Sequence, residues 1–186
     1  ILENDLLERL YAAIQAANCG FVGSALHGLS FVGDERPHQQ NIEFWESATP
    51  LDEIKRFREF GSHCAGHPER DVAAGIEVTT GPLGQGIANA LGMAIAEAYL
   101  NARFGDGLIN HRTYAFVGDG CLQEGVGQEM IALAGHLRLT KLTLIWDDNL
   151  ITDDGATSLS ISEDVAERFR VAGWHVQVLD GHDAEA

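Results

Sequence analysis

The spacing of hydrophobic residues is clearest in the second half of the chain. Short apolar runs there indicate buried strands, and longer stretches with helical spacing indicate amphipathic helices. In chain order the pattern predicts a long Ala-rich helix ending near Arg103, a strand over Arg112–Val117, a helix over Val126–Leu137, a strand over Leu142–Trp146, a helix capped by Ser162 and ended by Gly173, and a strand over Trp174–Leu179. This alternation predicts an α/β fold: a three-layer sandwich whose mainly parallel sheet is covered by helices on both faces.

The first half of the chain is less periodic. Asn4 or Asp5 can cap a helix that runs through Ile14 and stops at Gly20, and a second, short helix is predicted over Leu51–Phe60. Residues 20–50 hold Gly, Pro, His and Gln without a clear period, so we expect them to be irregular. The chain therefore divides into residues 1–50, a segment with few recognisable features, and residues 51–186, a single domain.

The 186 residues include 12 Lys and Arg against 28 Asp and Glu, which gives a net charge of −16 at pH 7. Nucleic acids and anionic membrane surfaces are poor partners for such a chain, because both require basic patches. Most of the acidic excess is expected to form a solvated surface. The three cysteines include no CxxC pair, and the sequence contains neither a signal peptide nor an apolar run of about 18 residues. These features predict a soluble, cytoplasmic protein.

Two polar side chains follow the ends of consecutive predicted strands. Asp119 lies between two glycines after the first strand, and Asn149 follows the second strand. Because the carboxyl ends of parallel strands meet at one edge of a sheet, we expect these side chains to lie close together. Their oxygens suit Mg²⁺, and the helix that opens near Val126 favours an anion. A lone Gly-Asp-Gly is most often a simple turn, but its pairing with Asn149 favours a cation that bridges the protein to a phosphate-bearing ligand.

Several motifs, in the same order along the chain, give this sequence a specific resemblance. The Gly118-Asp119-Gly120 run with Asn149 resembles the metal–diphosphate signature of thiamine-diphosphate enzymes. The wider context resembles transketolase over about Leu51 to Ala186 in Gly66–Glu69, Gly75–Ala90, Tyr114–Cys121, Asp147–Asn149, Gly173–Val176 and Asp180–Asp183. The resemblance implies a thiamine-diphosphate-binding fold with thiamine diphosphate and Mg²⁺ as cofactors.

The resemblance also implies roles for individual residues. Asp119 and Asn149 would bind Mg²⁺ through side-chain oxygens, and Ile151 would bind it through its backbone carbonyl. Gly118 belongs to the same signature, and Gly120 would lie against the diphosphate. His67 would contact substrate hydroxyls, and Glu124 resembles the family acid that connects the two cofactor sites of a dimer. The aminopyrimidine end of the cofactor would be received by Gly81 and Leu83, with Pro82 shaping the turn.

The sequence departs from the family pattern at several positions. The family's Ser-Gly-His-Pro and Asn-Gly-His-Gly-Ser motifs are absent, so we assign no role to His27 or His38. Leu150 stands where the family usually has Gly, and a positive φ there would cost on the order of 1 kcal/mol. We expect the domain to be incomplete at its C-terminus, without the family's pyrimidine-binding domain, and inactive unless that domain or a partner subunit is supplied.

The implied function is transfer of a two-carbon ketol unit between sugar phosphates, as in the pentose phosphate pathway, by a homodimer or by a heteromer with a pyrimidine-binding subunit. One alternative is another thiamine-diphosphate enzyme, such as a dihydroxyacetone synthase or a 2-oxo-acid dehydrogenase subunit. The other is an inactive truncated domain that acts as an interaction module. The Gly66-His67-Pro68 and Gly81-Pro82-Leu83 motifs favour the transketolase interpretation.

Overall fold

A computed structural model describes residues 22–23, 52, 55–56, 58–62, 69–70, 78–79 and 81–181. The helix predicted between Asn4 and Gly20 lies outside these ranges. Of the short helix predicted over Leu51–Phe60, Asp52 and Lys55 are helical, whereas Arg58 and Phe60 lie in turns. The helix therefore ends earlier than predicted, and Arg58 has a positive φ of 65° that no continuing helix would allow.

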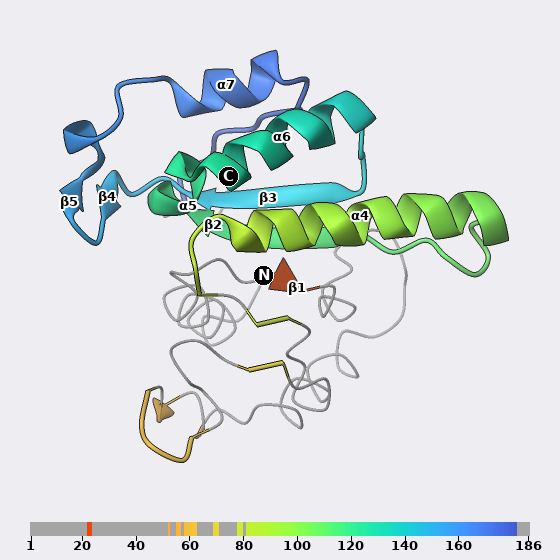
Figure 1. Ribbon diagram of the computed structural model, residues 1–186, viewed down its shortest axis with the longest axis horizontal. Coiled ribbons are helices and arrows are strands. Elements are labelled where there is room, and N and C mark those ends of the chain that lie inside the picture. Colours follow the sequence, from red (N-terminus) through yellow and green to blue (C-terminus); the bar gives the residue numbers. More distant parts are fainter. Residues whose placement is uncertain are drawn as a thin grey trace.

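Three strands form the main sheet, in the spatial order β1-β2-β3. The strands are β1 (Val22–Gly23), β2 (Thr113–Gly118) and β3 (Leu142–Asp147). The two longer strands are parallel, with Thr113 opposite Leu142 and Gly118 opposite Asp147. The short β1 strand pairs with β2 in the antiparallel direction. Because β2 and β3 are in register at their carboxyl ends, the residues that follow them emerge at the same edge of the sheet (Figure 1).

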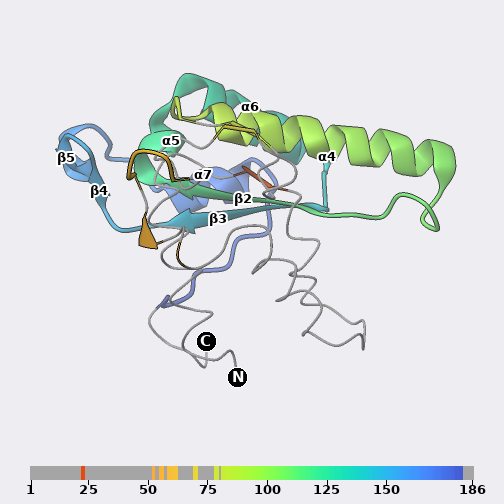
Figure 2. The ribbon, with the colours of Figure 1, turned by 90° about the horizontal axis from the view of Figure 1, so that it is seen from below.

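Helices cover one face of this sheet. Helix α4 (Gln85–Phe104) precedes β2, and helices α5 (Asp119–Gln123) and α6 (Gly125–Leu137) connect β2 to β3. Figure 2 shows α4 and α6 on the same side of β2 and β3. Along β2 the alternate residues Thr113, Ala115 and Val117 are buried, which is the alternation expected of a strand with one face on the core.

The core consists of two adjacent clusters beneath these helices. One contains Ala90, Leu91, Ala94, Ala115, Ala134 and Leu142, and the other contains Ile87, Val117, Cys121, Leu122, Ile131 and Phe169. Small alanines on α4 and α6 let the two helices pack closely on the sheet. The predicted α/β class is confirmed. Helices α4 and α6 form the helical layer on one face of the sheet (Figure 2).

The chain after β3 forms a small hairpin, β4 (Ile151–Thr152) and β5 (Gly155–Ala156), then the 3₁₀ turn η3 (Thr157–Leu159) and helix α7 (Val165–Val171). The prediction that Ser162 caps this last helix is wrong. The cap is Asp164, whose carboxylate accepts a hydrogen bond of 2.8 Å from the backbone N–H of Glu167. Asp164 directly precedes the first helical residue, which is where a side chain can reach that amide.

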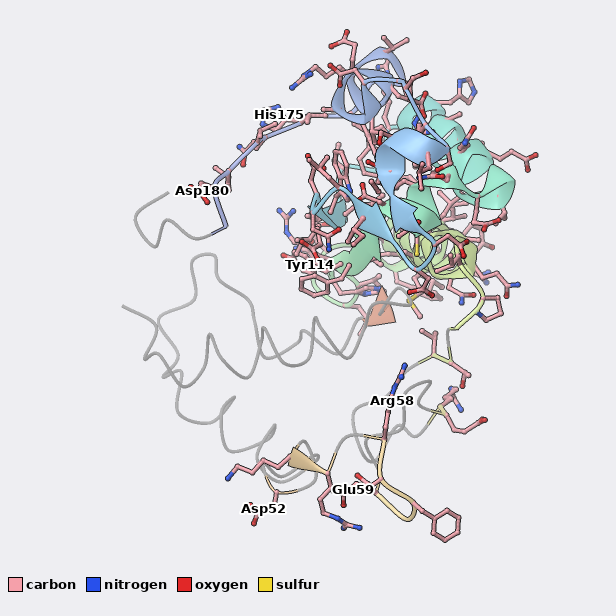
Figure 3. The ribbon with its side chains drawn as sticks, turned by 90° about the vertical axis from the view of Figure 1, so that its left-hand side faces the viewer. Asp52, Arg58, Glu59, Tyr114, His175 and Asp180 are labelled. Carbon is pink, nitrogen blue, oxygen red and sulfur yellow. The ribbon has the colours of Figure 1, made fainter. Side chains whose placement is uncertain are left out.

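The strand predicted over Trp174–Leu179 is also wrong. The segment is extended but pairs with none of the described strands, and Figure 3 shows it running from His175 towards Asp180, away from α7. Its first part is anchored by Trp174, whose indole donates a 2.9 Å hydrogen bond to the carbonyl of Ile131 and meets the ring of Phe169 edge-on. The apolar alternation reflects this packing rather than a ladder. None of the helices in the described ranges is long and apolar enough to cross a membrane.

Candidate functional site

The centre of the candidate site is a buried carboxylate at the end of β2. Asp119 is the first residue of α5 and is only 7% exposed. Its Oδ1 accepts a hydrogen bond of 3.2 Å from the indole N–H of Trp146, on the neighbouring strand. Its Oδ2 is inaccessible to solvent and has no hydrogen-bond partner within the described part of the chain. A buried acceptor with no partner is costly, so this oxygen suggests a ligand that the chain itself does not supply.

The surroundings of Asp119 disfavour its charged form. Burial raises the pKa of this carboxyl above its ordinary value of 3.8, and the nearby negative charge of Asp148 adds to the rise. The hydrogen bond from Trp146 and the backbone amides of Ile151 and Leu150 oppose it, lowering the pKa in part. Neither amide makes a well-formed hydrogen bond to Oδ2. A bound cation would supply the missing stabilisation of the charge.

Asn149 lies at the matching position after β3 and is held in a defined rotamer. Its amide N–H donates a 3.1 Å hydrogen bond to Asp147, and its Oδ1 accepts one of 3.1 Å from the backbone N–H of Ile151. An amide oxygen has two lone pairs, so Oδ1 keeps one for a second partner. The contributions of Leu150 and Ile151 to the pKa of Asp119 place this loop beside the buried carboxylate. The predicted juxtaposition at the sheet edge is thus what the structure has.

The loop between Asn149 and Ile151 needs a left-handed residue. Leu150 has φ of 62°, and its side chain is 65% exposed. A leucine at positive φ is strained, as predicted for this position if it requires such a φ. The carbonyl of Leu150 accepts a 3.0 Å hydrogen bond from the amide of Thr157, and the β4–β5 hairpin beyond it lies beside α5 (Figure 1). The surrounding hydrogen bonds therefore hold the strained residue in place.

A second loop, at the start of α4, packs against the same region. Gly84 precedes the helix with φ of 78°, and a Cβ atom there would lie 2.7 Å from the Cβ of Glu124. A Cβ on Gly120 would lie 3.1 Å from the side chain of Leu83. Leu83, the last residue of the predicted aminopyrimidine loop, thus lies against the start of α5, which carries Asp119 and Gly120.

The glycines on either side of Asp119 do not form a tight turn. Gly118 is extended with φ of −99° and Gly120 is helical. A side chain at position 120 would be crowded, because a Cβ atom there would lie 3.1 Å from the side chain of Leu83. Glu124 is exposed and lies between α5 and α6, as the C-cap of the first helix and the N-cap of the second.

The structure brings Asp119, Gly120, Leu83 and the Asn149–Ile151 loop together, whereas His67 lies outside the described residues. Sequence reasoning missed Trp146 and Gly84. Trp146 reads only as the apolar end of a strand, so nothing in its pattern reveals its hydrogen bond to Asp119. Gly84 had a signal, a glycine directly before a helix, but its close contact with Glu124 depends on tertiary packing.

Comparison with known proteins assigns a family to this arrangement. The family described as "Transketolase, thiamine diphosphate binding domain" matches residues 43–186. The chain is 58% identical over 137 residues to a transketolase of Sinorhizobium medicae, an alignment that covers 74% of this chain and 20% of the relative. The chain thus spans about a fifth of the length of the curated relatives that it matches.

Solved structures agree. A transketolase from Leishmania mexicana superposes with a TM-score of 0.64 at 50% identity, covering 74% of this chain and 22% of the other. A Pichia stipitis transketolase, solved in complex with sedoheptulose 7-phosphate, superposes with a TM-score of 0.62 at 48% identity, covering 67% and 19%. The fold and the sequence therefore point to one family.

Proposed function

Because the chain belongs to the transketolase family and carries its thiamine diphosphate binding domain, we propose that it binds the cofactor's diphosphate through Mg²⁺ at the edge formed by Asp119 and Asn149. The observation that carries this proposal is the buried Oδ2 of Asp119, which has no hydrogen-bond partner among the described residues. Magnesium usually takes one or two carboxylates together with phosphate oxygens and water. A single buried carboxylate at a sheet edge suits such a shared coordination shell.

The other residues of the edge fit the same group. Asn149 presents an amide oxygen that is already oriented by Asp147 and Ile151, and Ile151 can add its backbone carbonyl. These are hard oxygen donors of the kind that Mg²⁺ prefers. Within the described ranges there is no group of three or more His, Cys, Asp or Glu side chains that could hold a metal alone. That finding agrees with a cation whose remaining ligands come from the diphosphate.

The loops around the edge would bind the organic part of the cofactor. Gly120 would lie against the diphosphate, and the signature glycine Gly118 would set the path of the strand end. Gly81, Pro82 and Leu83 would receive the aminopyrimidine, and the contact between Leu83 and Gly120 supports a continuous surface from one part to the other. When bound, thiamine diphosphate supplies the carbanion chemistry, and the protein supplies position and electrostatics.

Two residues would act on substrate or on the partner site. We propose that His67 contacts the substrate hydroxyls, where an imidazole can accept and return a proton near neutral pH. Glu124 is exposed at the start of α6, a position from which a carboxylate can reach a neighbouring subunit. We propose that it connects the two cofactor sites of a dimer.

The reaction we propose is the transfer of a two-carbon ketol unit between sugar phosphates in the pentose phosphate pathway of the cytoplasm. The sugar phosphate bound by the Pichia stipitis relative supports this substrate class. Since the matched stretch is about a fifth of the relatives' length, we propose that turnover also needs a pyrimidine-binding domain, supplied in the same polypeptide or by a partner subunit. This chain would contribute the metal and diphosphate half of the site.

A matched pair of substitutions tests the proposal. The protein is expressed in full length, together with any partner subunit. Ketol transfer from a ketose phosphate to an aldose phosphate is then assayed. Asp119→Asn should lower turnover by more than about 100-fold, because it removes the charged metal ligand. Asp154→Asn, at the exposed tip of the β4–β5 hairpin, should retain wild-type turnover. An Asp119→Asn variant with full activity would refute the assignment.

A further inference from the structure

The contact between Trp146 and Asp119 suggests a role for the indole that no family motif assigns. Trp146 is the next-to-last residue of β3 and pairs with Val117 across the parallel ladder. Its ring packs, half buried, against the core cluster that contains Val117 and Leu122. Any large apolar side chain could fill this space, but of the apolar residues only tryptophan adds an N–H donor. That donor is used: it binds Oδ1 of Asp119 at 3.2 Å.

This hydrogen bond distinguishes the two oxygens of the carboxylate. Oδ1 is held by the indole, whereas Oδ2 is buried and has no partner among the described residues. Partial rotation of the carboxyl group about its last bond would move both oxygens out of this arrangement. The rigid indole, fixed by the strand ladder and the core, opposes that rotation. One oxygen is therefore anchored and the other is left to bind a ligand.

We propose that Trp146 is a positioning residue for the metal site: its indole N–H holds Oδ1 of Asp119 so that Oδ2 is presented to the cation. This inference rests on the proposed function, because it assumes that Asp119 binds Mg²⁺. Groups that hold a metal ligand in its orientation typically change metal affinity 10- to 100-fold when they are removed. The role is separate from core packing, because phenylalanine keeps a flat aromatic ring in the core but has no donor.

Trp174 provides a matched control. Its indole also donates a hydrogen bond, 2.9 Å long, to the carbonyl of Ile131, and it is also half buried in the same cluster. The bond is made to a helix backbone and not to a proposed metal ligand. Trp174→Phe therefore removes an indole N–H and some packing without touching Asp119.

The experiment is a calorimetric titration of thiamine diphosphate into the wild type, Trp146→Phe and Trp174→Phe, each with Mg²⁺ and with chelator. Each protein is expressed in full length, together with any partner subunit. We expect Trp146→Phe to weaken binding about tenfold or more in Mg²⁺, and binding in chelator to be negligible for all three proteins. Trp174→Phe should change binding in Mg²⁺ by less than about twofold. Equal losses for both variants in Mg²⁺ would reduce Trp146 to a packing residue.

The wild-type titration separates the two proposals. If the wild type binds only with Mg²⁺ and Trp146→Phe has the same affinity, the role of Trp146 alone is overturned. If the wild type binds equally well without Mg²⁺, the proposed function is overturned and this role with it.

If Trp146→Phe does not fold, the indole N–H resonances of the wild type are measured instead. The three tryptophans are assigned through Trp45→Phe and Trp174→Phe, and the Trp146 signal should shift on addition of Mg²⁺ and thiamine diphosphate. An unmoved signal would contradict the proposal.

Discussion

At the scale of single residues, the candidate site depends on one buried carboxylate, that of Asp119. Its position at the same sheet edge as Asn149 could be predicted, because the two residues follow neighbouring parallel strands. The burial of Asp119 could not be predicted, because it depends on Trp146 and on a loop that begins about 30 residues later. Burial is what makes this carboxylate costly without a ligand.

The raised pKa of Asp119 predicts how metal-free stability depends on pH. Because the folded chain holds this proton more tightly than the unfolded chain, the protonated carboxyl favours folding. That contribution is fully present below about pH 3.8 and is lost as pH rises through the raised value. Asp119→Asn, which mimics the uncharged form, should therefore be more stable than the wild type by about 1–3 kcal/mol at pH 7 in chelator. The difference should shrink as pH falls towards 4.

Chemical denaturation at several pH values measures this effect. Asp154→Asn, an exposed carboxylate of the hairpin, serves as the control and should change stability little at any pH. An Asp119→Asn variant that is less stable than the wild type at pH 7 would show that the carboxylate is already satisfied in the folded chain. Such a result would remove the main physical reason for a ligand at Oδ2.

The backbone at Leu150 is strained, because this leucine has a positive φ of 62° where the family usually has glycine. Leu150→Gly should stabilise the chain by about 1 kcal/mol, because glycine adopts this conformation without a Cβ penalty. Leu150→Ala keeps the Cβ and loses only an exposed side chain, so it should give no such gain. Thermal unfolding of the two variants checks this. Equal stability changes for Gly and Ala would mean that the loop relaxes at no cost.

At the scale of helices and strands, the periodic second half of the chain was predictable to within one or two residues. The helix predicted over Val126–Leu137 is Gly125–Leu137, and the strand predicted over Leu142–Trp146 is Leu142–Asp147. The errors lie where local pattern does not decide. The segment after Gly173 has alternating apolar residues like a strand, but side-chain packing holds it. The ion pair between Lys141 and the buried Glu97, with an N–O distance of 2.6 Å, joins residues 44 positions apart, so no local pattern predicts it.

Close packing between α6 and the end of α7 gives a prediction at this scale. A Cβ on Gly135 would overlap the backbone carbonyl of Ala172, which cannot move without displacing the end of α7. Gly135→Ala should therefore destabilise the chain by about 3 kcal/mol. Gly125, in the same helix, has no atom near its Cβ position, so Gly125→Ala should change stability by less than about 1 kcal/mol. Similar denaturation midpoints for the two variants would contradict the close contact.

At the scale of the whole molecule, the α/β class and the use of a sheet edge follow from the order of the elements. The direction of β1 could not be predicted, because two residues carry no pattern and their pairing with β2 is a tertiary contact. The net charge of −16 excludes partners but does not identify a site. Only one of those charges, that of Asp119, lies at the proposed metal position. Identification therefore depends on the geometry of the edge and on the family match together.

The central claim, that Asp119 and the Asn149–Ile151 loop bind thiamine diphosphate through Mg²⁺, is tested most directly by calorimetric titration of the wild-type protein with the cofactor. Parallel titrations are run with Mg²⁺ and with chelator, and Asp119→Asn is measured beside them. The account predicts binding that needs Mg²⁺ and that Asp119→Asn abolishes. Equal affinity with Mg²⁺ and with chelator, or undiminished binding by Asp119→Asn, would contradict it.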